Sequence, residues 1–196
     1  MNKGLIVILF VVGILVIGGM SLMGSYNGLV RLDEQVKQSW TQVENVYQRR
    51  LDLVPNLVET VKGYAAHEKE TFIAVTEARS KAAGSITPDI INNPDKFQAF
   101  QASQSALNSA LSRLLVVVEK YPDLKANENF LSLQAQLEGT ENRIAVERGR
   151  FNESAQMFNT RIRQFPTSIL AGVFGFSTKE YFKSEEQAKT APKVQF

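Results

Sequence analysis

Residues 130–165 read FLSLQAQLEGTENRIAVERGRFNESAQMFNTRIRQF, and this stretch decides the fold class. Large apolar side chains recur there at every seventh position: Phe130, Leu137, Ile144, Phe151, Phe158 and Phe165. A seven-residue repeat places such groups along one seam of a helix that faces partner helices. The period-two alternation that is typical of strands is missing. The stretch therefore predicts a long helix in an all-α bundle.

Two segments upstream carry apolar stripes of the same kind. Apolar side chains recur three or four positions apart between positions 29 and 61, and again between positions 97 and 121. This spacing is typical of helices that bury one face. Breaker residues separate the segments where the chain must reverse: Gly84, Pro88, Pro94, Pro122 and Asp123. We therefore expect an antiparallel bundle of three or four long helices.

Local signals suggest where these helices begin and bend. Thr87 and Asn93 each stand before a proline, which is typical of an N-cap followed by the first helical residue. Asn127 is a third candidate N-cap. Pro55 interrupts the first stripe, and a proline inside a helix costs about 3 kcal/mol. Either the first helix kinks at Pro55 or it divides into two helices, and Gly63 is a second point where it can bend.

The amino-terminal residues are much more hydrophobic than the rest of the chain. Residues 4–23 read GLIVILFVVGILVIGGMSLM, with Ser21 as the only polar side chain. A helix of this length is about 30 Å long, which matches the hydrocarbon core of a bilayer. We interpret residues 4–23 as a retained transmembrane anchor after a short flank at residues 1–3. A cleaved signal peptide and a buried core helix are the alternatives.

The charges beside residues 4–23 give little guidance on topology. Lys3 lies on one side of the apolar run, and Arg31 and Lys37 lie on the other. A short basic start before a long apolar run is typical of an uncleaved export signal. We therefore expect the amino terminus on the cytoplasmic side of the membrane and the bundle outside the cytoplasm. The opposite topology stays open.

The composition of the 196-residue chain excludes several kinds of site. Disulfides, Cys-ligated metals and thiol nucleophiles are impossible because the chain has no Cys. The 22 Lys and Arg nearly balance the 20 Asp and Glu, and no clustered basic face suggests nucleic acid. Phosphate-binding glycine motifs and a Gly-x-Ser-x-Gly elbow are missing from the sequence. We expect no cofactor, no metal and no nucleic-acid partner.

His67 is the only histidine, and it stands close to Glu68 and Glu70. A His-Glu-x-x-His zinc site would need a second histidine. A single histidine beside carboxylates is most often a solvated residue on a helix face, so we predict no catalytic residue. A hydrolase-type enzyme that uses His67 with nearby carboxylates is kept as an alternative.

Charged and amide side chains interrupt the apolar stripes. Because burial of a charge is costly unless the charge is paired, these groups should meet one another or border a groove. One interpretation is that they fix the register of the helices. The other is a groove for a protein partner, and its candidate residues are Arg49, Arg50, Asp52, Glu141 and Arg148. Gln104 and Asn152 are further polar residues on or beside the stripes.

A second candidate surface lies near the carboxyl terminus. Residues 169–176, ILAGVFGF, are apolar and too short to span a bilayer. Exposed apolar groups at this density mark contact with protein or membrane, and packing back on the bundle is the alternative. The candidate contact residues are Ile169, Leu170, Val173, Phe174 and Phe176. Residues 183–196 are mostly polar and predict a mobile tail.

Several motifs resemble one known family. They are residues 26–30 (YNGLV), 39–40 (SW), 49–58 (RRLDLVPNLV), 61–65 (VKGYA), 67–68 (HE), 119–126 (EKYPDLKA), 165–166 (FP), 174–176 (FGF) and 181–182 (YF). In this order they resemble the LemA family of bacterial membrane proteins over residues 26–182. One departure is Phe151 before Asn152, where that family more often has tyrosine. The resemblance implies an amino-terminal membrane anchor and long antiparallel helices, and it implies no particular reaction.

These observations lead to a functional hypothesis. The protein is expected to be a membrane-anchored, non-catalytic helical interaction or scaffold protein. It would contact the bilayer through residues 4–23, and it would bind a protein partner or further copies of itself. The alternatives are the hydrolase built on His67 and a membrane-shaping helper that inserts residues 169–176 into lipid.

Overall fold

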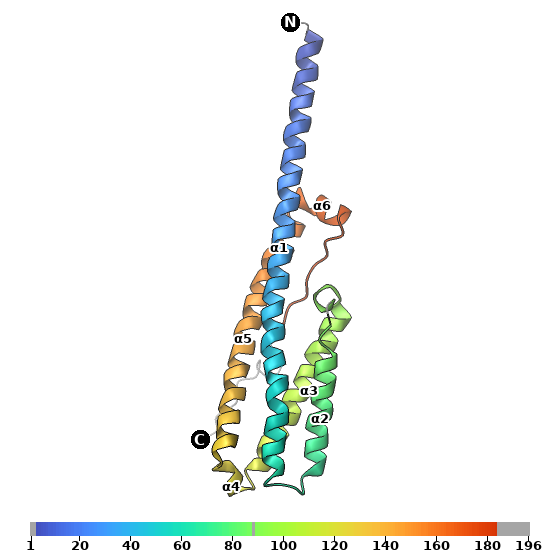
Figure 1. The fold of residues 1–196 in the computed structure, drawn as a ribbon. Helices are drawn as coiled ribbons and strands as arrows, with labels where there is room; N and C mark the ends of the chain where they lie inside the picture. The colour runs from blue at the N-terminus through green and yellow to red at the C-terminus, as the bar shows by residue number, and fades with distance from the viewer. Residues whose placement is uncertain (1–2, 88, 184–196) are drawn as a thin grey trace, which may run out of the picture.

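The computed structural model describes residues 3–87 and 89–183 (Figure 1). Its elements are α1 (Lys3–Lys62), α2 (Lys69–Gly84), the 3₁₀ turn η1 (Ile90–Asn92), α3 (Pro94–Val118), α4 (Pro122–Lys125), α5 (Glu128–Arg163) and α6 (Thr167–Val173). These two ranges contain no strand, and the prediction of an all-α bundle is confirmed. Residues 1–2 of the predicted flank and residues 184–196 of the predicted tail lie outside the described residues.

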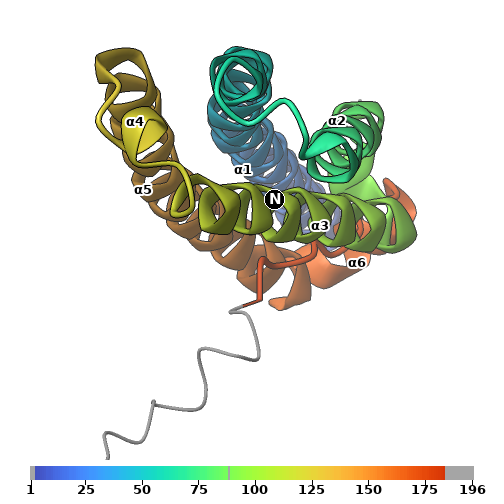
Figure 2. The ribbon, with the colours of Figure 1, turned by 90° about the horizontal axis from the view of Figure 1, so that it is seen from below.

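Four long helices make up the bundle. α1 and α3 run in one direction and α2 and α5 in the other (Figure 1). α1 packs mainly on α5, and α2 packs mainly on α3. Seen from below, α5 and α2 lie on either side of α1, and α3 runs diagonally across them (Figure 2). This is the antiparallel arrangement that short connections produce.

The apolar start of α1 projects beyond the other helices (Figure 1). Its large side chains, such as Phe10, Ile17 and Met20, are exposed. Among the described residues, α1 is the one helix long and apolar enough to cross a membrane. Its most apolar 18-residue window has a mean hydropathy of 2.0, and none of that window is buried. A core helix would be mostly buried, so the structure does not support that alternative.

The first stripe forms one helix that continues through Pro55 and ends at Lys62. Pro55 has no N–H to donate to the carbonyl of Leu51, four residues earlier. The Nε of Arg79 on α2 donates to that carbonyl oxygen at 2.8 Å instead. This bond satisfies the free acceptor and ties α2 to α1. The predicted division at Pro55 does not occur, because Pro55 lies within a continuous helix. The helix ends at Lys62, and the chain reverses just after Gly63.

Two of the three predicted helix caps are confirmed. The Oδ1 of Asn93 accepts hydrogen bonds at 3.0 and 3.1 Å from the N–H groups two and three residues later. The Oδ1 of Asn127 accepts one at 3.0 Å from the N–H three residues later. The prediction for Thr87 was wrong, because its buried hydroxyl has no hydrogen-bond partner among the described residues and Asp89 stands at the N-cap position of η1.

The buried side chains form two clusters stacked along the bundle. The cluster toward α4 is mainly aliphatic and includes Leu57, Leu107 and Leu114. The other is rich in aromatic rings, among them Trp40, Phe97, Phe100, Phe151 and Phe182. The Trp40 ring centroid lies 5.4 Å from that of Phe151 and 6.1 Å from that of Phe182. Apolar burial along the predicted stripes therefore holds the four long helices together.

Phe165 is the exception to the predicted seam of α5. It is 82% exposed, because α5 ends at Arg163 and Phe165 lies beyond the helix. The peptide bond between Phe165 and Pro166 is cis. α6 follows, and residues 177–183 then return along the bundle without regular secondary structure (Figure 1). We call residues 177–183 the strap.

Candidate functional site

Three polar side chains form a layer between the two core clusters. Arg50 on α1 is only 3% exposed. Its Nη1 donates to the Oε2 of Glu141 on α5 at 3.1 Å, and its Nη2 donates to the Oε1 of Gln104 on α3. The Nε2 of Gln104 donates to the carbonyl of Ala82 on α2 at 3.4 Å. One network thus joins all four long helices.

The network explains why polar residues interrupt the apolar stripes. A buried guanidinium is tolerated only where it is paired and hydrogen-bonded. Shifting any one of the helices by a turn would separate Arg50 from its partners, so the layer favours one register. The Nε of Arg50 is buried and has no hydrogen-bond partner in the part of the chain that the structure describes. The hydrogen-bonding capacity of this guanidinium is therefore not exhausted.

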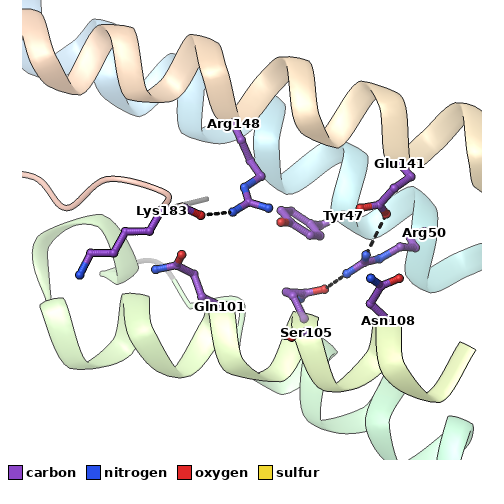
Figure 3. Close-up of a pocket in the computed structure, with 9 residues that line it drawn as sticks. Tyr47, Arg50, Gln101, Ser105, Asn108, Glu141, Arg148 and Lys183 are labelled. Atoms are coloured by element: carbon purple, nitrogen blue, oxygen red, sulfur yellow. Dashed lines mark hydrogen bonds and ion pairs between the residues drawn. The ribbon is translucent and has the colours of Figure 1, made fainter. Parts of the chain in front are cut away.

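A cavity of about 200 Å³ opens beside this network. Its lining is polar and consists of Tyr47, Arg50, Gln101, Gln104, Ser105, Asn108, Glu141, Arg148 and Lys183. Side chains from α3 face side chains from α5 across the cavity, and α1 contributes the residues between them (Figure 3). Three lining residues are cationic and one is anionic. The cavity therefore favours an anionic group that accepts hydrogen bonds.

The structure brings together three of the five residues that were predicted to line a partner groove. Arg50, Glu141 and Arg148 all line the cavity. Arg49 and Asp52 lie on the exposed side of α1, and Asp52 accepts a hydrogen bond at 2.8 Å from a glutamine of the same helix. Of the α3 residues that line the cavity, Gln104 was visible in the sequence as a polar interruption of the stripe, whereas Gln101, Ser105 and Asn108 carry no motif that could have identified them.

One wall of the cavity is the end of the strap. The Nη2 of Arg148 donates to the carbonyl of Lys183 at 3.1 Å. The guanidinium carbon of Arg148 also lies 4.7 Å from the ring centroid of Phe182. The cavity is therefore complete only when the strap is in place.

Two asparagines of α5 hold the strap by its backbone. Asn152 donates to the carbonyl of Phe182 at 2.9 Å and accepts from the N–H of Phe182 at 2.8 Å. Asn159 makes the same pair of bonds with Lys179 at 2.9 and 2.8 Å, and it also donates to the hydroxyl of Tyr181 at 2.9 Å. Asn159 was missed in the sequence. Its signal is the dipeptide Phe-Asn at residues 151–152, which recurs seven residues later at 158–159.

An ion pair fastens the strap to α1. The Nζ of Lys179 lies 2.9 Å from one carboxylate oxygen of Asp33, and the Nζ of Lys37 lies 3.0 Å from the other. Burial by itself raises the pKa of Asp33, but the hydrogen bonds from Lys179 and Lys37 outweigh it and the pKa is lowered. The hydrogen bonds that Lys37 donates to Glu34 and to Asp33 raise the pKa of Lys37. Asp33 is thus charged at neutral pH and holds the strap.

The predicted contact residues near the carboxyl terminus fall into two groups. Ile169, Val173 and Phe174 are exposed. Leu170 and Phe176 are half-buried, and the ring of Phe176 lies 6.1 Å from that of Phe158. The segment therefore packs on the bundle with one side and leaves an apolar side open.

His67 is exposed in the connection between α1 and α2, and it is not on a helix face as the sequence suggested. No group of three or more His, Asp or Glu among the described residues has a geometry that could hold a metal ion.

The fold and the cavity define a helical bundle that continues directly from an apolar helix long enough to cross a membrane. The LemA family matches residues 39–196, which is most of the chain, and the protein belongs to this family.

Curated relatives agree with this assignment. Magnetosome protein MamQ of Magnetospirillum gryphiswaldense is 27% identical over 187 residues, which cover 87% of this chain and 69% of the relative. Magnetosome protein MamQ 2 of Paramagnetospirillum magneticum has the same identity and coverage. Protein LemA of Metamycoplasma hominis is 25% identical over 164 residues, which cover 84% of this chain and 71% of the relative.

Proposed function

We propose that the protein is a membrane-anchored, non-catalytic interaction protein that holds an acidic segment of a partner in the cavity between α1, α3 and α5. The partner is another membrane protein or a second copy of this chain. The anchor is the apolar start of α1, with the amino terminus in the cytoplasm and the bundle outside it.

The continuity of α1 carries this proposal. α1 is a single helix of 60 residues, so about 90 Å of unbroken helix joins the apolar span to the far end of the bundle. A flexible linker would let the bundle move freely above the membrane. A continuous helix holds the cavity at a defined height and direction, as a docking platform needs.

The chemistry of the cavity supports an acidic partner group. Arg50 and Arg148 supply guanidinium donors, and Gln101 and Asn108 supply side-chain amides. Guanidinium groups form strong charge-assisted hydrogen bonds with carboxylates. A cavity of about 200 Å³ accommodates one side chain of a partner and not a large metabolite.

Photocrosslinking in intact cells tests the proposal. A crosslinking amino acid at Ser105, which lines the cavity, is expected to give a discrete adduct of the full-length protein. The same amino acid at Ala106, which is exposed on the same helix and does not line the cavity, serves as the control. An adduct of twice the chain mass indicates self-association, and any other mass indicates a partner. Equal adducts at both positions would reject the cavity as the docking site.

A charge change separates recognition from mere proximity. Asn108→Asp adds a negative charge to the cavity with little change of shape and is expected to weaken the Ser105 adduct. Asn142→Asp adds the same charge at an exposed position of α5 and is expected to leave the adduct unchanged. If the yield of the Ser105 adduct is unchanged by both substitutions, the proposal that the partner presents an acidic group to the cavity is contradicted.

The side of the membrane has its own test. A reporter that works only in the cytoplasm, fused to Phe196, is expected to be inactive. An active reporter would reverse the proposed topology and leave the anchoring in place.

The catalytic alternative is tested through His67. His67→Ala is expected to leave the Ser105 adduct and the growth of the host unchanged, because this side chain is exposed in a turn. A loss of function with intact folding would favour acid–base chemistry.

A further inference from the structure

We propose that α6 lies flat in the lipid–water interface of the same bilayer that α1 enters, with Phe165, Ile169, Val173 and Phe174 turned toward the lipid. We call these four residues the α6 apolar face. The inference rests on the proposed anchoring by α1, and it adds a second membrane contact that the anchor alone does not require.

The composition around α6 suits an interface. The residues from 164 to 178 include no charged side chain, and the exposed Arg163 precedes them. A basic residue beside an apolar segment suits the headgroup region, where anionic lipids attract it.

The side chains of the α6 apolar face are largely exposed. Ile169 and Val173 lie four positions apart on α6 and are 59% and 74% exposed, and Phe165, just before α6, is 82% exposed. Phe174 is 55% exposed. An apolar patch of this kind is unusual on a surface that meets only water.

The opposite side of α6 is already used by the bundle. Ala171 is buried, and the N–H of Phe176 donates to its carbonyl at 2.9 Å. Gly175 has a φ of +73°, a conformation that glycine adopts easily, and this turn directs Phe176 back toward Phe158. The α6 apolar face therefore points away from the side of α6 that packs on the bundle.

The position of α6 beside the end of the apolar span indicates that lipid contacts the α6 apolar face. The ring centroid of Phe174 lies 4.6 Å from that of Tyr26 on α1. Tyr26 follows the last residue of the apolar span, Met23, by three residues, which is about 4.5 Å along a helix. Figure 1 shows α6 beside α1 where α1 leaves the bundle. The polar interface of a bilayer is about 5–8 Å deep on each side, so a span at residues 4–23 places α6 within it.

Two membrane contacts have a mechanical consequence. A bundle held by α1 alone could rotate about the α1 axis and tilt with it. A second contact beside α1 fixes one side of the bundle against the lipid. The cavity between α1, α3 and α5 then faces a defined direction relative to the membrane surface.

Spin-label accessibility in the full-length chain tests the inference. The chain has no native cysteine, so single cysteines can be introduced and labelled with a nitroxide at Val173, at Ile17 in the span, and at Val116 on α3. Val116 is 65% exposed and serves as the matched control outside the span. The protein is reconstituted in vesicles of phosphatidylethanolamine and phosphatidylglycerol. Collisions with oxygen, which enters lipid, are compared with collisions with a polar nickel complex, which stays in water.

The expected result is an oxygen-to-nickel collision ratio at Val173 several-fold above that at Val116 and of the same order as that at Ile17. A label at Ile169 should agree, which guards against a local effect of one substitution. If Ile17 lies in lipid while Val173 resembles Val116, the inference is overturned and the anchor stands. If Val173 is shielded from both reagents, protein covers the face and the lipid assignment is overturned. If Ile17 itself is in water, the proposed anchoring fails and the inference fails with it.

Discussion

Replacing Asn159 with Ala is expected to release the strap from α5. The change removes the partners of both the N–H and the C=O of Lys179, a residue that is only 6% exposed. A buried backbone group that loses its partner costs about 1–3 kcal/mol, so the loss of two partners should lower the unfolding free energy by about 2–6 kcal/mol. The bond to the Tyr181 hydroxyl adds little, since water can replace it there.

The assay uses the single tryptophan of the chain. Trp40 is buried and stacks on Phe182 of the strap with ring centroids 6.1 Å apart. Release of the strap exposes Trp40, so its emission should shift to longer wavelength before global unfolding in guanidinium. Asn142→Ala, at an exposed position on the same helix, should change stability by no more than about 0.5 kcal/mol.

The double variant sharpens this test. Asn152 and Asn159 hold the same segment, so the second substitution should cost less once the first has released the strap. If the losses of unfolding free energy from the two substitutions simply add, Asn152 and Asn159 hold the strap independently. An Asn159→Ala variant as stable as Asn142→Ala, with unshifted Trp40 emission, would refute the account of the strap.

Three further predictions follow from the polar contacts. Arg50→Ala should cost about 3 kcal/mol in the unfolding free energy, because it leaves the buried amide oxygen of Gln104 without its donor. Glu141→Ala should cost less than about 1 kcal/mol, because the Glu141 side chain is 51% exposed. Because the pKa of Asp33 is lowered, its ion pairs stabilise the fold at neutral pH, and this stabilisation is lost as the pH falls below about 4. Asp33→Asn should therefore reduce the decrease of the unfolding free energy at acid pH. Arg79→Ala should cost about 1–2 kcal/mol by thermal or denaturant unfolding, and this cost should shrink in a Pro55→Ala background, where the helix satisfies its own carbonyl. Equal losses of stability from Arg50→Ala and Glu141→Ala would contradict the account of the Arg50 network. An acid limb that Asp33→Asn leaves unchanged would contradict the role of the Asp33 ion pair. A cost of Arg79→Ala that is the same with Pro55 and with Ala at position 55 would contradict the role of the Arg79 hydrogen bond.

The long helices could be predicted because apolar burial repeats with the period of the helix. The stripes around Val54, Leu107 and Phe151 are the cores of the two clusters, and no long-range information is needed to find them. The need of Arg50 for partners was also visible, since a charge on a buried stripe must be paired. Its three-dimensional neighbours could not be read from the sequence, because Gln104 and Ala82 come from other helices.

Other features depend on tertiary contacts that leave no periodic trace. Pro55 predicted a kink or a division, but a donor from Arg79 compensates for its missing N–H and the helix continues. The strap is held partly through its backbone, by Asn152 and Asn159, and such bonds do not depend on the side chains of the strap. Its Lys179 pairs with Asp33, and two residues so far apart in sequence show no periodic relation. Phe165 continued the heptad in sequence after the helix had ended, which is why the pattern misplaced it on the core seam.

The central claim is that one rigid helix joins the bilayer to the bundle. The most direct test is the distance between spin labels on cysteines at Met20, in the span, and Asn45, on the exposed side of the bundle part of α1. With the full-length protein in phospholipid vesicles, 25 residues of unbroken helix predict a single narrow distance distribution between the two backbone positions of about 38 Å. A broad distribution, or a clearly shorter distance, would show a flexible joint between anchor and bundle and would contradict the account.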